Sequence, residues 1–251
     1  MSMFFRSKKP STPGSFSSLG VDLHSHLIPG IDDGVRTVEE SLTLIRRLAA
    51  MGFRKIYTTP HVMADHYPNT RERILEGRDL VLEGLRARRS DSEGGDGIEF
   101  GAAAEYFLDE RFEELLQNGD LLTLPGDRVL VEMAGVAPAS NLLGLLFRMQ
   151  TKGYKPVLAH PERYPYYWRD FKAIERLKEQ SCEFQLNLLS LTGHYGSQVR
   201  EQAFKLLKLG MIDFLATDMH HEQHADKLEA ALQDKKVRKV LDGNTFKNAR
   251  L

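Results

Sequence analysis

The chain has 251 residues, of which 41% are hydrophobic and 27% charged, so it can bury one full core and we expect a single domain. Its formal net charge of −1 argues against a general nucleic-acid-binding protein, although the charge does not exclude the active site of a nuclease. The single cysteine, Cys182, cannot form an internal disulfide, which predicts a cytoplasmic location, and no apolar run approaches the roughly 20 residues that span a bilayer.

The first residues are predicted to form a flexible tail. Residues 1–19 are rich in Ser, Pro and Gly, and the folded domain is expected to cover residues 20–251. A weak contact between the segment Met3–Lys9 and an anionic membrane remains an alternative, but stable insertion into the membrane is not expected.

Helices and loops alternate along the rest of the chain. Thr37-x-x-Glu40 is typical of a capping box, and the helix it opens is expected to stop at Gly52. A second helix should begin after Asn69 or Thr70, and its end leads into an exposed linker from Ser90 to Gly97. Helical spacing predicts further helices over 109–118, 139–152 (with Leu142, Leu143, Leu146 and Met149 inward), 171–180, 197–209 and from 226 to the C-terminus.

Nearly every predicted strand ends on a residue that can bind metal. The first strand, Val21–His24, leads into His26, and alternate side chains of an extended chain share a face, so both imidazoles can point at one ion. Taken alone, His-x-His also fits two ordinary loop histidines. The strands that begin at Lys55, Ile98, Val129, Pro156 and Asp213 run into His61, Glu105, Glu132, His160 and Asp218, and His220 follows two residues later.

The exception is the strand Cys182–Asn187, which ends on a neutral amide able to bond substrate or water. About seven strands, each followed by a helix, predict parallel pairing in a closed or nearly closed (β/α) barrel. Catalytic groups of such barrels lie at the carboxyl ends of the strands, where the candidate ligands already stand.

The candidate ligands are nitrogen and oxygen donors without thiolate: His24, His26, Asp33, His61, Glu105, Glu132, His160, Asp218 and His220. Such donors favour Mn, Fe or Zn, and because one ion takes about four to six ligands, nine groups indicate about two or three ions. Closely spaced ions clamp an oxyanion and make hydroxide available near neutral pH, which is what phosphate ester hydrolysis requires. The remaining histidines, His66, His194, His221 and His224, are interpreted as surface residues.

Other residues near the strand ends suggest how a substrate is held. Arg163 can grip a phosphate through two hydrogen bonds, with a surface salt bridge as the alternative. Leu188 stands where a cysteine-dependent phosphatase needs an arginine, so Cys182 is interpreted as a small buried hydrophobe. Some aromatic residues after strand ends can line a pocket for an aromatic substrate, although any single one can equally be packing: Tyr67, Tyr106, Tyr166, Tyr167 and Trp168.

Taken together, these motifs resemble the polymerase and histidinol phosphatase (PHP) superfamily, and within it the bacterial manganese-dependent protein-tyrosine phosphatases that regulate capsule and exopolysaccharide synthesis. The resemblance runs from about Gly20 to the C-terminus and is carried by 22-DLHSH-26, 29-PGIDDG-34, 59-TPH-61, 104-AE-105, 160-HPER-163 and 217-TDMH-220.

The resemblance implies a single-domain, distorted seven-stranded (β/α) barrel like that of triosephosphate isomerase. It also implies a trinuclear site, with Mn first and Fe or Zn as alternatives, held by the nine residues. Asp33 is preferred to Asp32 only on this ground. Arg163 is assigned to phosphate binding, and Asp33 and His61 to catalysis as well.

The implied substrate is a phosphotyrosine protein, the tyrosine-rich tail of a membrane tyrosine autokinase. Relatives often place an arginine shortly after the final Asp-x-His, and none follows His220 here until well beyond it. Whether Lys227 or His224 substitutes for it is left open. Three other readings remain: a histidinol-phosphate or other small-molecule phosphatase, a metal-dependent nuclease, and a non-catalytic binding protein.

Overall fold

The computed structural model describes residues 14–90 and 97–251, and all of its strands pair in parallel. One sheet has the order β1 (Val21–Asp22), β2 (Lys55–Thr58), β4 (Glu99–Ala102), and the other has the order β3 (His61–Val62), β5 (Glu105–Phe107), β6 (Arg128–Glu132), β7 (Lys155–Ala159), β8 (Glu183–Asn187), β9 (Phe214–Ala216). β3 resumes the path of β2 after a break that contains Pro60, which has no N–H for the ladder. β5 likewise resumes β4, so the strands occupy the seven predicted positions.

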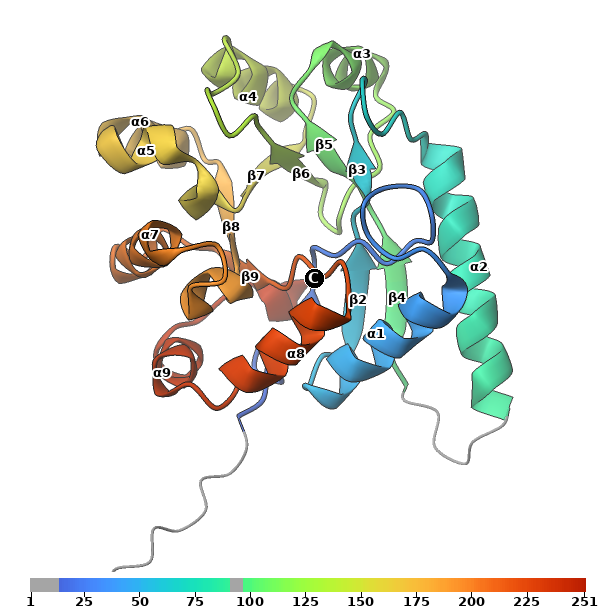
Figure 1. The fold of residues 1–251 in the computed structure, drawn as a ribbon. Helices are drawn as coiled ribbons and strands as arrows, with labels where there is room; N and C mark the ends of the chain where they lie inside the picture. Colours follow the sequence, from blue (N-terminus) through green and yellow to red (C-terminus); the bar gives the residue numbers. More distant parts are fainter. Residues whose placement is uncertain (1–13, 91–96) are drawn as a thin grey trace, which may run out of the picture.

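The strands close into a ring, as predicted for a (β/α) barrel. Beyond the last ladder, the N–H of Asp218 donates to the carbonyl of His24 and the N–H of His26 donates to the carbonyl of Met219, both at 2.8 Å. The buried carboxylate of Asp22 accepts from both the N–H and the hydroxyl of Thr217, at 3.0 and 2.6 Å. Figure 1 looks into this ring, with the helices arranged around its outside.

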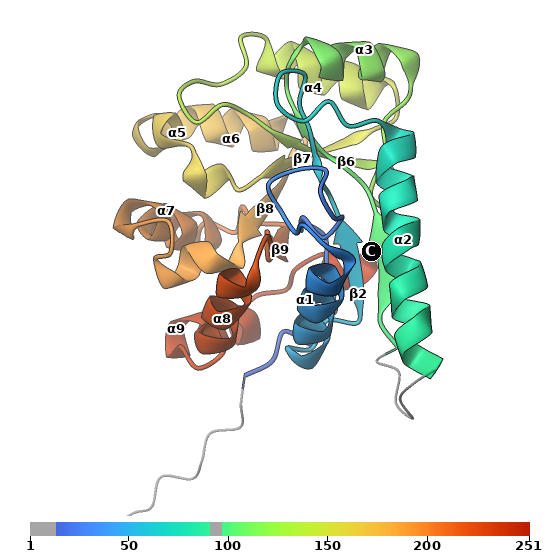
Figure 2. The same cartoon turned by 45° about the vertical axis from the view of Figure 1, so that its right-hand side comes forward.

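The helices that cover the ring are α1 (Val38–Ala50), α2 (Arg71–Ser90), α3 (Glu110–Asn118), α4 (Leu142–Thr151), α5 (Pro165–Arg169), α6 (Phe171–Glu179), α7 (Ser197–Lys208), α8 (Glu222–Ala231) and α9 (Lys235–Gly243), with 3-10 turns η1 (Pro161–Arg163), η2 (Leu188–Thr192) and η3 (Asn248–Arg250). At the start of α1 the hydroxyl of Thr37 accepts from the N–H of Glu40, as expected for a cap, while the Glu40 carboxylate reaches back to the N–H of Arg36. α1 and α2 lie side by side next to β2 and β4 (Figures 1 and 2).

Two helix predictions were wrong in detail. Leu143 was expected to face inward, but it is 43% exposed, and the buried face of α4 is formed by Leu142, Leu145, Leu146 and Met149. These four follow the helical spacing from Leu142, whereas Leu143 is rotated by about 100° from it. The C-terminal helix predicted from residue 226 is two helices, α8 and α9, because Asp234 caps the second one through the N–H of Lys236.

The folded part of the chain begins before residue 20. Residues 1–13 of the predicted tail and 91–96 of the predicted linker lie outside the described residues. Phe16 and Leu19, however, are almost fully buried, and the Phe16 ring stacks on Phe53 with centroids 5.5 Å apart. The end of the predicted tail therefore packs into the core.

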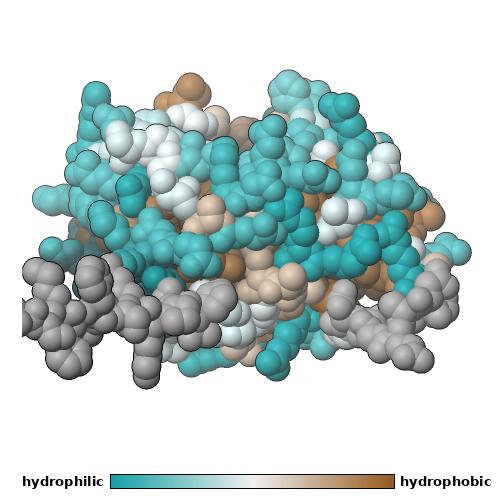
Figure 3. All heavy atoms as spheres, turned by 60° about the horizontal axis from the view of Figure 1, so that its bottom comes forward, coloured by the Kyte–Doolittle hydropathy of each residue, from teal (hydrophilic) through white to brown (hydrophobic). Residues whose placement is uncertain are grey.

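Apolar side chains fill the inside of the ring. A polar functional site is therefore expected at the ends of the strands, where polar residues stand, and not inside the ring. Leu130, Val157 and Phe214 are fully buried in this interior cluster, and larger clusters lie between the strands and the helices. The face of the molecule seen in Figure 3 is mostly hydrophilic, with hydrophobic residues showing between polar ones. Among the described residues, no helix has the length and apolar character needed to cross a bilayer.

Candidate metal centre

All nine predicted ligands meet at the carboxyl ends of the strands. They form overlapping groups whose nitrogen and oxygen atoms lie within 4.8 Å of one another: His26, Asp33, His61 and His220; His24, His160 and Asp218; His24, His26 and Glu105; His61, Glu105 and Glu132. The overlap places five histidines and four carboxylates around one space. Parallel strands bring their carboxyl ends to one edge, which is why residues so far apart in the chain converge here.

His24 and His26 follow β1 and are both fully buried. Their Nε2 atoms face each other at 3.3 Å, and Glu105 Oε2 lies 3.1 Å from Nε2 of His24 and 3.5 Å from Nε2 of His26. Two ring nitrogens and a carboxylate oxygen that converge on one point are donors of the kind that bind a divalent metal ion. The geometry therefore favours a cation at this place.

Several buried atoms of the centre have no hydrogen-bond partner. They include His61 Nδ1, Glu105 Oε2, Glu132 Oε1 and His160 Nδ1. His61 Nδ1 is only 2.9 Å from Glu132 Oε1, yet the pair lacks hydrogen-bond geometry. Buried polar atoms are normally hydrogen-bonded, so such a cluster of unsatisfied donors and acceptors fits a set of metal ligands. The residues present therefore fit divalent ions bound by nitrogen and oxygen.

Asp33 and Asp32 take different positions, although they are neighbours in sequence. Asp33 Oδ1 lies 3.5 Å from both His61 Nε2 and His220 Nε2 and belongs to one of the ligand groups. Asp32 instead lies behind His26, with its Oδ2 2.7 Å from His26 Nδ1 and accepting from the N–H of His61 at 3.1 Å. Asp32 thus orients a predicted ligand histidine from outside the cluster.

Electrostatics in the cluster follow from its carboxylates. Burial disfavours the charged form of His24, but the charges of Glu105 and Asp218 outweigh it and raise its pKa to about 9. The hydrogen bond with His220, helped by the charges of His220 and His61, lowers the pKa of Asp33 to about 2. Asp33 is therefore a carboxylate at neutral pH and attracts positive charge to the space between it and the histidines.

The backbone is strained at two of the predicted ligands. His160, directly after β7, has φ 36°, and Asp218, after β9, has φ 52°. Non-glycine residues seldom adopt this left-handed region, and such residues cluster at functional sites. Both residues belong to the group of possible metal-binding side chains that also contains His24.

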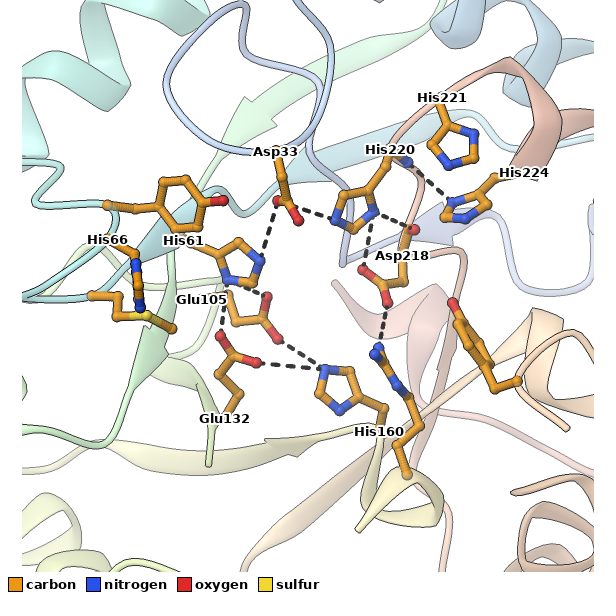
Figure 4. A pocket seen from close by; sticks show the side chains of 14 residues that line it. Asp33, His61, His66, Glu105, Glu132, His160, Asp218, His220, His221 and His224 are labelled. Atoms are coloured by element: carbon orange, nitrogen blue, oxygen red, sulfur yellow. Dashed lines mark hydrogen bonds and ion pairs between the residues drawn. The ribbon is translucent and has the colours of Figure 1, made fainter. Parts of the chain in front are cut away.

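The cluster opens into a cavity of about 670 Å³. Figure 4 shows His61, Glu105, Glu132 and His160 turned toward it, with Asp218 and His220 facing them. Arg163 also lines the cavity, where its Nη1 donates to Asp218 Oδ2 at 3.1 Å and its guanidinium lies over the ring of Tyr195 at 4.6 Å. One hydrogen bond leaves most of the Arg163 N–H groups free for an anion in the cavity.

The histidines interpreted as surface residues are not all on the surface. His66 and His221 are exposed and line the wall of the cavity. His224 is buried, so the prediction that it is a surface residue was wrong. Burial and the nearby His221 and His220 lower the pKa of His224 to about 3, so it brings no positive charge to the cavity. Lys227 lies outside the cavity lining and its Nζ is 2.7 Å from Nδ1 of His194.

The aromatic candidates separate into three groups. Tyr67 lines the cavity and stacks on His61, with ring centroids 5.4 Å apart. Tyr106 and Tyr167 are core residues, and Tyr166 and Trp168 line a different cavity. Sequence reasoning missed Tyr195, which stands in a glycine-flanked loop where the local pattern gives no signal.

Cys182 is buried in the core, as predicted. Burial raises the pKa of its thiol to about 12, so no thiolate is available at neutral pH.

Comparison with known proteins finds a family model described as "Capsular polysaccharide synthesis, CpsB/CapC", which matches residues 20–247. The tyrosine-protein phosphatase YwqE of Bacillus subtilis is 28% identical over 205 residues, 80% of this chain and 77% of that protein. The tyrosine-protein phosphatase CpsB of Streptococcus pneumoniae is 28% identical over 209 residues, 80% and 83% of the two chains. A crystal structure from work on YwqE and CpsB, described there as unique metal-dependent tyrosine phosphatases, matches with a TM-score of 0.77 and 25% identity, covering 92% of this chain and 94% of that one.

Proposed function

This chain belongs to the CpsB/CapC family of capsular polysaccharide synthesis and is a metal-dependent tyrosine phosphatase, and on that premise we propose that its nine clustered ligands form the catalytic centre. The observation that carries the proposal is the set of overlapping ligand groups at the end of the barrel, with unsatisfied buried atoms, opening into a cavity beside Arg163. Nine donors are enough for three divalent ions. Imidazole and carboxylate without thiolate support Mn, with Fe or Zn as alternatives.

Divalent ions bound here would lower the pKa of a coordinated water and would offer positive charge to the phosphate oxygens. The chain's own residues hold and orient the substrate. Arg163 can donate to the non-bridging oxygens of the phosphate, because its guanidinium is fixed by Asp218 and by the face of Tyr195. Cys182 takes no part, since it is buried in the core with a protonated thiol.

Among the proposed ligands Asp33 is the most exposed, and His61 lies beside it, with its Nε2 3.5 Å from Asp33 Oδ1. The Asp33 side chain is 54% exposed, those of His61, Glu132 and His220 are 14%, 13% and 15% exposed, and those of His24, His26 and Glu105 are at most 1% exposed. Because Asp33 is a carboxylate at neutral pH, its oxygens can accept a hydrogen bond from a water at the cavity and orient it toward the phosphate. We assign a catalytic role to Asp33 on this ground, and to His61 because it lies next to Asp33 at the cavity.

The cavity also supports an aryl phosphate as substrate. Tyr67 and Tyr195 both line the cavity, Tyr67 against His61 and Tyr195 against Arg163, so their rings are available to flank a phenyl ring. A phenoxide is a better leaving group than an alkoxide, since the reference pKa of tyrosine is about 10. The proposed substrate is phosphotyrosine in a protein, specifically the tyrosine-rich tail of a membrane tyrosine autokinase that the enzyme meets in the cytoplasm.

A metal analysis combined with a substrate panel tests this proposal. The purified protein should contain divalent metal, and kcat/KM should be higher for a phosphotyrosine peptide than for the same peptide with phosphoserine or for histidinol phosphate. A preference for histidinol phosphate would contradict the proposed protein substrate, whatever the metal content. A dephosphorylated autokinase tail, detected with the full-length kinase in membranes, would identify the partner.

A further inference from the structure

Strand β8 carries two buried amides that point to the metal centre without belonging to any ligand group. Gln185 and Asn187 are both 0% exposed. They are two residues apart on one strand, so their side chains share a face. A buried amide is unfavourable unless its donors and acceptors are satisfied, so its hydrogen bonds indicate its purpose.

The two amides link His24 to Asp218 in a continuous chain of hydrogen bonds. His24 Nδ1 lies 2.8 Å from Gln185 Oε1, and Gln185 Nε2 donates to Asn187 Oδ1 at 2.8 Å. Asn187 Nδ2 then donates to Asp218 Oδ2 at 2.7 Å. The strand end is also fixed from behind, because Glu162 Oε1 accepts from the N–H of Asn187 and the hydroxyl of Ser190, at 3.1 and 2.6 Å.

The direction of this chain is set by its carboxylate end. Asp218 Oδ2 also accepts from Arg163 and can only accept while it is ionised, so Asn187 must present its NH₂ group to it. The Asn187 oxygen then faces Gln185, which must present its own NH₂ group there. The Gln185 oxygen is left facing His24, and an amide oxygen cannot donate, so Nδ1 of His24 must carry a proton, which is the only ring proton when His24 is neutral.

This arrangement leaves His24 Nε2 and Asp218 Oδ1 available to bind a metal ion. With its proton on Nδ1, His24 offers the lone pair of Nε2, which lies 3.1 Å from Glu105 Oε2 and 3.3 Å from Asp218 Oδ1. Asp218 uses Oδ2 for Asn187 and Arg163, so Oδ1 stays directed at His24 and His26.

We propose that Gln185 and Asn187 are positioning residues that hold His24 in its Nε2-binding tautomer and keep Asp218 Oδ1 free for the same metal ion. The proposal deepens the proposed metal centre and rests on it. It explains why this one strand ends on an amide where the other strands end on ligands.

Metal titration of metal-stripped protein tests the proposal without reference to turnover. Gln185→Leu removes the acceptor of His24 and the donor to Asn187, and the affinity for Zn²⁺ or Mn²⁺ measured by calorimetry should fall about ten- to hundredfold. Asn248→Leu is the matched control, because Asn248 is also a fully buried amide with its hydrogen bonds satisfied, but it joins β1 and β9 through Val21 and Leu215. This control should lower stability and leave the metal affinity unchanged.

A second readout reports the tautomer itself. Nitrogen NMR of the Zn²⁺-loaded protein should show His24 protonated at Nδ1, and Gln185→Leu should reduce the population of that tautomer. Gln185→Glu should restore part of the affinity, because a carboxylate oxygen also accepts from Nδ1. If Gln185→Leu does not fold, Gln185→Asn, which withdraws the amide by one methylene, gives the same comparison.

The outcomes separate this proposal from the proposed function. Native affinity and a native tautomer in a folded Gln185→Leu or Gln185→Asn variant would overturn the role of the amides and leave the metal centre intact. An equal loss of affinity in Asn248→Leu would also overturn it, by showing a general effect of buried amides. Failure of the unaltered protein to bind metal would overturn the metal centre itself.

Discussion

Replacing Arg163 by alanine should lower kcat/KM for a phosphotyrosine peptide without emptying the metal centre. In the structure Arg163 donates one hydrogen bond to Asp218, and its other N–H groups remain available at the cavity. Losing a charged hydrogen-bond partner of a phosphate costs about 1.5–3 kcal/mol. This loss corresponds to a roughly ten- to hundredfold lower kcat/KM.

The metal should remain because Asp218 keeps the donor from Asn187 when Arg163 is removed. Arg163→Lys should give an intermediate loss, since lysine keeps the charge but cannot form paired hydrogen bonds or lie flat on Tyr195. Arg169→Ala is the matched control, because Arg169 is exposed, follows soon after in the chain and lines a different cavity.

Steady-state kinetics and metal content should be measured on the same preparations of all three variants. Wild-type kcat/KM in Arg163→Ala would refute the phosphate-binding role. Loss of metal in parallel with activity would show instead that Arg163 supports the centre through Asp218. A decrease of similar size in Arg169→Ala would point to a general effect of positive charge near the substrate.

Chelation of divalent ions should abolish turnover and Mn²⁺ should restore it, so full activity in metal-stripped protein would contradict the metal centre. Cys182→Ser should leave turnover nearly unchanged, because the buried thiol has a pKa of about 12 and forms no thiolate; lost turnover in a folded variant would revive a thiol mechanism. Phe16→Ala should lower the free energy of unfolding by about 3–5 kcal/mol in urea titration, since it empties a fully buried site beside Phe53. An unchanged unfolding midpoint would show that this segment contributes nothing to the core.

The barrel could be predicted because its strands are short apolar runs that each end on a polar residue. Parallel pairing then brings the strand ends together, which is enough to collect the ligands in one place. Which ligands contact each other could not be predicted. The approach of His160 to Glu105, at 3.2 Å, depends on the left-handed turn at His160 and on the register of neighbouring strands, and neither is visible in a local pattern.

The errors have local physical causes. Leu143 was placed inward because four apolar residues crowd the start of α4, and only the phase of the helix decides which of them faces the core. His224 was read as a surface residue, although Ala225 and Leu228 follow it on the same buried side of α8 and gave a usable signal. Asn187 was expected from sequence to bond substrate or water, whereas in the structure its side chain bonds Gln185 and Asp218, and a pairing of this kind cannot be read from the sequence because buried and exposed amides are written alike.

The ring of strands is completed where the first strand, β1, meets the last strand, β9. Asp22 and Thr217, which are joined by hydrogen bonds, are 195 residues apart. A contact between residues so far apart in the sequence costs loop-closure entropy, and it forms slowly during folding. Until β9 has docked, we expect β1 to keep an unpaired edge open to other chains, and His24 and His26 to lack Asp218 and His220. We therefore expect docking of this last strand to close that edge and to bring Asp218 and His220 to the other proposed ligands in the same event.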